Sequence, residues 1–269
     1  QKSQGISNTY SISNNWDLIS ENALCLATKS ADYNGNGKVD FRDFFKEDTK
    51  FSYSADQREL RSCSLLDHHA GKINISKIIS ILSDHSGQGL ESKNKVEAIE
   101  SGHGICMHSD SVDKGSNTAA SVIADLCADD TRLPIYWTSM YSPCTGIFLP
   151  NFMEGSLNES VTFGEKKSSQ NSAWWIFYYL NQSLKTGNAQ DLAHLREEFD
   201  NLQTEFLSTA YNLAEDSYSL IEKNKYHVVE KRLTEYMENN FVKAIDVAKS
   251  FIKTGEYSQN SVNSKLSLG

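Results

Sequence analysis

Hydrophobic and polar residues follow two different patterns along the chain, and the first of them fills residues 5–165. Ile6, Tyr10 and Ile12 stand among polar residues in 5–13, which predicts a strand. Apolar residues at 75, 78, 79 and 82 predict a helix with Ser76 as its cap. Further strands are predicted at 104–108, 118–125 and 133–140. Strands mixed with helices indicate an α+β body.

The second pattern occupies the last hundred residues. Apolar residues recur there in steps of three and four, at Leu192, Leu195, Phe199, Leu202, Phe206, Thr209 and Leu213. A second stripe runs from Val229 to Phe251, after a break near Asn224. We therefore expect a helical hairpin in residues 166–255, packed on a body formed by residues 1–165 and followed by a flexible tail, 256–269.

Composition narrows the classes of function. The chain has 26 basic and 35 acidic side chains, a formal net charge of −9, which argues against nucleic acid as the partner. The longest apolar run, Trp174 to Leu180, is too short to span a membrane. Five cysteines without CxxC spacing favour a reducing compartment, so we expect a cytoplasmic protein.

One segment fits the template of a calcium-binding loop. Oxygen ligands are expected at positions 1, 3, 5, 9 and 12, a backbone carbonyl at position 7 and glycine at position 6. These positions are filled by Asp32, Asn34, Asn36, Asp40 and Asp43, by Lys38 and by Gly37. Position 12 is usually Glu rather than Asp. The alternative is a turn whose Asp and Asn side chains cap their own backbone.

Histidine and cysteine form weaker constellations. Asp67, His68 and His69 form one group, and the segment from His103 through Cys106 to His108 forms another. Either group could contribute to a zinc site, but neither has the helical spacing of paired ligands, so hydrogen-bonded histidines are the favoured interpretation. Cys106 and Cys144 are considered as nucleophiles. Because no neighbour in the sequence supplies a base, buried inert thiols are favoured instead.

Several segments in order resemble one known family. They are GISNTYSIS (5–13), GKVDFRDFF (37–45), ISKIISILSDHSG (75–87), GICMHSD (104–110), NTAASV (117–122), WTSMYSPCTGIFLP (137–150) and SAWWIFYYLN (172–181). Taken together they resemble the secernins and related cysteine-dependent dipeptidases. The order and spacing of the segments carry the resemblance, which covers most of the chain.

The resemblance implies an αββα sandwich of the N-terminal-nucleophile hydrolase type, here in part, with the helical hairpin at its C-terminal end. In that family the first residue of the mature chain is a cysteine that attacks an amide carbonyl, and its own α-amine is the base. This chain begins with Gln1, and the resemblance starts partway through the family sequence. We therefore expect the C-terminal part of an enzyme that hydrolyses short peptides and needs no cofactor.

The resemblance also bears on single residues and on partners. It implies that Asn8 is an oxyanion-hole side chain, while the residue pattern alone allows a turn residue at a strand end. Relatives lack a full ligand set at the 32–43 loop, so calcium there would be particular to this lineage. The alternative function is a non-catalytic regulator associated with exocytosis. Its hairpin would bind a protein partner or a second copy of the chain.

Overall fold

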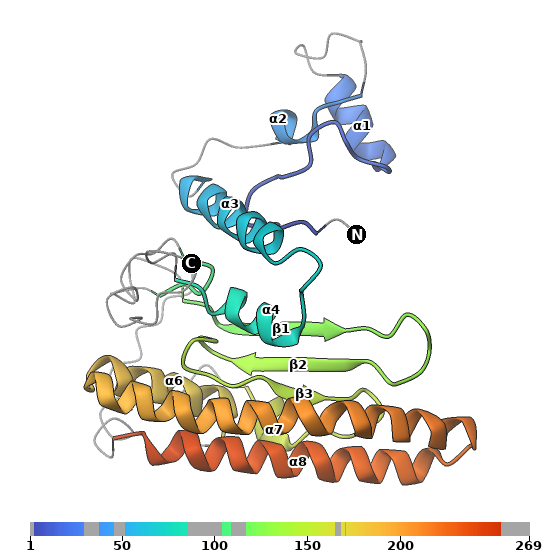
Figure 1. Cartoon of the computed structure of the whole chain (residues 1–269). Coiled ribbons are helices and arrows are strands. Elements are labelled where there is room, and N and C mark those ends of the chain that lie inside the picture. The colour runs from blue at the N-terminus through green and yellow to red at the C-terminus, as the bar shows by residue number, and fades with distance from the viewer. Residues whose placement is uncertain are drawn as a thin grey trace.

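The computed structural model describes residues 3–29, 38–45, 52–85, 104–108, 117–164, 168–169 and 171–253. It is a mixed α+β structure in which a small antiparallel sheet lies against long helices (Figure 1). The helices are α1 (Glu21–Thr28), α2 (Phe41–Phe45), α3 (Ser52–His68), α4 (Ile75–Leu82), α5 (Glu159–Thr162), α6 (Ala173–Lys185), α7 (Ala189–Glu222) and α8 (Tyr226–Ser250). The strands are β1 (Ala120–Asp125), β2 (Ile135–Met140) and β3 (Leu149–Asn151).

The sheet has the order β1-β2-β3 with both pairs antiparallel. Its central row places Ile123 opposite Trp137, and Trp137 opposite Pro150. Side chains of β2 alternate between fully and partly buried, as expected for a strand with one face on the core. The strands predicted at 118–125 and 133–140 are confirmed by β1 and β2.

Helices α7 and α8 run side by side beneath the sheet (Figure 1). The chain reverses between them at Asn224, which has a positive φ of 58°, so the break lies where the sequence indicates it. The three-and-four spacing of α7 serves the core rather than a free surface, because its central side chains are buried. These side chains are Leu195, Phe199 and Phe206.

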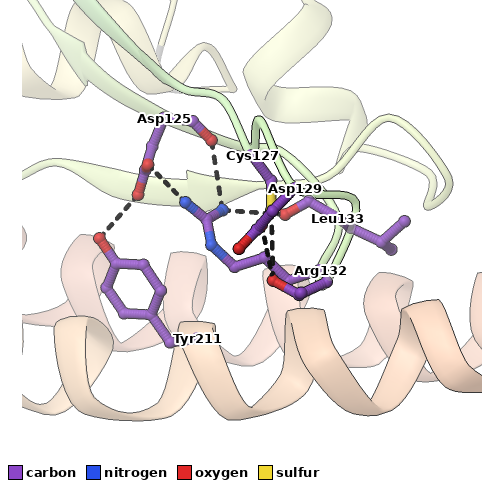
Figure 2. Close-up of polar contacts among 7 residues, drawn as sticks. Asp125, Cys127, Asp129, Arg132, Leu133 and Tyr211 are labelled. Atoms are coloured by element: carbon purple, nitrogen blue, oxygen red, sulfur yellow. Dashed lines mark hydrogen bonds and ion pairs between the residues drawn. The ribbon is translucent and has the colours of Figure 1, made fainter.

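A polar clamp fastens the β1–β2 hairpin to α7 (Figure 2). Arg132 Nη2 lies 2.6 Å from Asp125 Oδ1, and Arg132 Nη1 donates to the carbonyl of Leu133 at 3.0 Å. The hydroxyl of Tyr211, on α7, donates to the second oxygen of Asp125 at 2.6 Å. The side chains of Asp125, Arg132 and Tyr211 are partly buried, so the clamp fixes the position of the sheet over the helices.

Two predicted strands do not form. Residues 5–13 contain only an isolated bridge between Ser7 and Thr9, and Ile6 is exposed. Residues 104–108 are bends and irregular backbone. Alternation alone predicts which residues could line a strand, but a strand also needs a ladder of hydrogen bonds to a second strand, and neither segment belongs to the sheet of the described residues.

Two helical features also differ from expectation. The sequence pattern does not predict helix α3, because the segment is largely polar. In the structure only Ala55 and Leu65 among its described side chains are buried. Helix α4 is capped by Asn74 rather than by Ser76: the Asn74 side chain accepts a hydrogen bond from the backbone N–H of Lys77 at 2.9 Å. No helix in the described ranges is long and apolar enough to cross a membrane.

Candidate metal centre

Four buried side chains converge on one point from three segments of the chain. His85 follows the end of α4, Cys106 and His108 lie in the 104–108 segment, and Cys144 lies in the connection between β2 and β3. One ligand atom from each residue is within 4.8 Å of all the others. Two thiols and two imidazoles are the donor set of tetrahedral zinc sites, so this is a candidate metal centre.

The distances within the cluster are close to those of a tetrahedral site. His108 Nε2 lies 3.1 Å from His85 Nε2, 3.3 Å from Cys106 Sγ and 3.2 Å from Cys144 Sγ. Zinc at about 2.1 Å from nitrogen and 2.3 Å from sulfur separates two nitrogens by about 3.4 Å, and nitrogen from sulfur by about 3.6 Å. The three distances to His108 Nε2 are therefore a few tenths of an ångström shorter than those of a zinc site.

Backbone contacts bring the 104–108 segment against the end of α4. The N–H of Cys106 donates to the carbonyl of Asp84 at 2.9 Å. Gly104 is essential to this approach, because a Cβ at that position would lie only 2.6 Å from the Cα of His85. The carboxylate of Asp84 is held in turn by Arg61 through two hydrogen bonds of 2.9 and 2.7 Å. The residue before His85 is thus held through both its backbone carbonyl and its side chain, which positions His85.

The turn that presents Cys144 is held by α6. Tyr141 enters the turn with a positive φ of 58°, a conformation that is unfavourable for a bulky side chain. Its ring is buried and packs edge-on against Trp174 at 5.3 Å, which holds it there. Next to Cys144, the hydroxyl of Thr145 accepts a hydrogen bond from the buried amide of Asn181 at 3.0 Å.

The two thiols have opposite shifts in pKa. Hydrogen bonding from Cys106, and then from the imidazoles of His108 and His85, holds the pKa of Cys144 well below its usual value despite its burial. Burial, together with its position as the donor to Cys144, raises the pKa of Cys106. A bound cation would favour the ionised form of both thiols, because a cysteine binds a metal as its thiolate.

The sequence identifies part of this centre. The sequence places Cys106 and His108 in one group but favours hydrogen-bonded histidines over zinc there, and the structure instead brings both residues into a cluster of four possible ligands. His103, the third member of that group, lies outside the described residues. His85 and Cys144 were not grouped with them. The signal available in the sequence is the Cys-x-His pair alone, because the other two ligands are brought in by tertiary contacts.

The other histidine pair does not form such a site. His68 and His69 lie at the C-terminal end of α3 with their rings 4.8 Å apart. His68 is exposed, and among the described residues neither histidine belongs to a cluster of three or more possible metal ligands.

Asn8 and the calcium-loop residues lie far from the metal centre in the sequence. Asn8 is exposed, and its Oδ1 accepts a hydrogen bond from Arg58 Nη2 at 3.2 Å. Of the loop residues, Asp32, Asn34 and Asn36 lie outside the described residues.

Local contacts hold the described half of the loop, residues 38–43. Lys38 Nζ donates to the carbonyl of Trp16 at 2.7 Å and lies over its ring. Asp40 Oδ1 accepts from the N–H of Asp43 at 3.0 Å, which caps the start of α2. Asp40 therefore has the capping role that the alternative interpretation of this segment requires.

Comparison of the chain with protein-family models, with curated proteins and with solved structures finds no match. The resemblance to secernins therefore stays a prediction.

Proposed function

We propose that this protein binds zinc and that His85, Cys106, His108 and Cys144 hold one ion in a closed structural site. The observation that carries the proposal is the mutual approach of four buried ligand atoms to within 4.8 Å. Catalytic zinc sites keep a position open for water or substrate, whereas structural sites use four protein ligands. With four protein ligands in the core, the expected role of zinc is to fasten the end of α4 to the sheet.

The test is the metal content of the full chain purified under reducing conditions. We expect one zinc ion per chain and a lower melting temperature after the metal is removed, because an ion that binds only the native state stabilises it. Replacement by cobalt should give the absorption of a tetrahedral cobalt–thiolate site. A chain that takes up no zinc from zinc-containing buffer would contradict the proposal.

Two variants separate the site from the remaining thiols. Cys106→Ser should lose zinc, whereas Cys127→Ser should keep it, because Cys127 bonds to Asp129 on the β1–β2 hairpin and is not part of the cluster. Equal zinc content in both variants would place the ion elsewhere.

A second candidate function is the hydrolysis of short peptides by a secernin-like αββα enzyme of which this chain is the C-terminal part. Two of the segments that carry the resemblance, 104–110 and 137–150, supply Cys106, His108 and Cys144, so in this proposal the centre braces the enzyme's fold. Asn8 would stabilise the oxyanion through its amide N–H, with its Oδ1 fixed by Arg58. The nucleophile would come from outside this chain.

The oxyanion role is tested in a protein that carries both the family cysteine and this chain. Asn8→Ala should raise the activation barrier for dipeptide hydrolysis by about 3 kcal/mol, as loss of one oxyanion donor does. Ser7→Ala is the matched control on the same segment. An unchanged kcat in Asn8→Ala would remove Asn8 from the mechanism.

Calcium binding at residues 32–43 is a further candidate, favoured by one observation. Helix α1 precedes the loop and α2 begins within its last positions, which is the helix–loop–helix order of calcium-binding hands.

A further inference from the structure

The metal centre contains two neighbouring thiols. Cys106 and Cys144 come from different segments, yet their sulfurs lie within 4.8 Å of each other. Their sulfurs also share contact with the same nitrogen, Nε2 of His108. The two thiols can therefore bind one metal ion together with His108, or they can form a disulfide with each other.

We propose that the centre is redox-controlled: a peroxide oxidises Cys106 and Cys144 to a disulfide, and the zinc ion is released. This inference rests on the proposed zinc site and adds its regulation. The donor set makes the two states mutually exclusive. Both anionic ligands are consumed by one disulfide, and the two neutral imidazoles that remain, His85 and His108, do not make a four-ligand site.

The reaction balances with a peroxide as oxidant. One thiolate attacks a peroxide oxygen, the O–O bond breaks and a sulfenic acid forms; the second thiolate then attacks that sulfur and expels hydroxide. In total, two thiolates give up two electrons, hydrogen peroxide accepts them, and two protons complete two molecules of water. The zinc ion is released because the disulfide no longer carries the two negative charges that the thiolates supplied.

Burial limits the access of a peroxide to the two thiols. Cys106 and Cys144 are only 2% and 1% exposed, so the oxidant enters through local opening of the site. The remaining cysteines lie elsewhere: Cys25 on α1, Cys63 on α3 and Cys127 on the hairpin. None of them belongs to the ligand cluster, so the switch is confined to one pair.

The experiment uses the full chain with Cys25, Cys63 and Cys127 replaced by serine, loaded with zinc under reducing conditions. Hydrogen peroxide is added, and free zinc is followed with a chromophoric chelator while intact mass is measured. We expect one zinc ion released per chain, a mass lower by two hydrogen atoms, and recovery of both after reduction. Only Cys106 and Cys144 can form the disulfide in this protein.

The matched control is Cys106→His in the same background, which keeps four ligands but removes the second thiol. It should retain zinc under peroxide at least about tenfold longer than its parent. If Cys106→His takes up no zinc, Cys144→His serves as the control instead. The mass measurement on the parent protein does not depend on either variant.

The outcomes test the redox switch and the zinc site separately. A reduced parent without zinc contradicts the zinc site itself. A parent that binds zinc but keeps it under peroxide contradicts only the switch. Release that accompanies added oxygen rather than a disulfide, or that is equally fast in Cys106→His, also overturns the switch.

Discussion

Arg61 on α3 forms a two-pronged ion pair with Asp84, the residue directly before the ligand His85. Both side chains are mostly shielded from water, and the carbonyl of Asp84 also accepts the N–H of Cys106. A charged contact outside the ligand set thus orients two of the four ligands at once. Such outer contacts commonly decide how tightly a metal is held.

Arg61→Ala should therefore weaken zinc binding by about tenfold or more, measured by competition with a chelator of known affinity. Arg42→Ala is the matched control, because Arg42 forms a longer and more exposed ion pair with Asp56 at 3.7 Å. Equal zinc affinity in the two variants would show that the Arg61 contact does not position the ligands.

Gly104→Ala should damage the centre by steric conflict. The added methyl group would stand 2.6 Å from the Cα of His85 and 2.8 Å from the carbonyl of Asp84, so the backbone must move. We expect a loss of about 1 to 3 kcal/mol in the free energy of unfolding, with weaker zinc binding. Gly164→Ala, where the methyl meets open space, should change stability by less than about 0.5 kcal/mol. Matching unfolding curves for the two variants would contradict the packing at Gly104.

Tyr211→Phe tests the clamp between the hairpin and α7. Removal of the hydroxyl deletes one donor to the carboxylate of Asp125 and should cost about 1 kcal/mol in urea unfolding at neutral pH. Tyr226→Phe, at an exposed tyrosine, should have no comparable effect. A midpoint for Tyr211→Phe that equals the wild-type midpoint would show that the clamp adds nothing.

The same tyrosine predicts a pH dependence. Burial and the bond to Asp125 raise the pKa of Tyr211 to about 12, above its value of about 10 in an unfolded chain. A raised pKa means that the folded state holds this proton more tightly, so its contribution is complete below pH 10 and is lost as pH rises through 12. The stability difference between wild type and Tyr211→Phe should shrink over that interval. A difference that stays constant from pH 8 to 12 would refute the assignment.

Calcium binding is tested by adding calcium to zinc-loaded, calcium-free protein, without a chelator that could strip zinc. A site filled to a hundred times its Kd should stabilise the fold by about 2.7 kcal/mol, seen as a higher melting temperature. Asp40→Ala should abolish this shift. Ser20→Ala is the matched control, because it also removes a helix cap but is not in the loop. No shift at millimolar calcium in the wild type would remove the calcium site.

The sequence predicts the parts of the fold that depend on local pattern. Alternation is enough for β1 and β2 because one face of each strand packs on a core. Helix α7 is equally readable, since Leu195, Phe199 and Phe206 repeat on one face. Strand β3 has three residues and contains Pro150, which gives no alternation to detect.

The metal centre is less predictable because it is assembled by tertiary contacts. Cys106 and His108 are two residues apart, but His85 and Cys144 reach them only through the backbone bond at Asp84 and the turn at Tyr141. Glycine at position 104 is the sequence feature that permits this approach, and its significance is visible only once the facing backbone is known.

The order of the four ligands along the chain has a consequence during synthesis. Cys144 completes the set before α6, α7 and α8 have been made. At about 5 to 20 residues per second, the ribosome needs roughly 5 to 20 seconds more to deliver the end of α8. A zinc ion bound in that interval would hold the turn between β2 and β3 against α4 in the nascent chain. It would do so before α6, α7 and α8 cover the apolar face of the sheet.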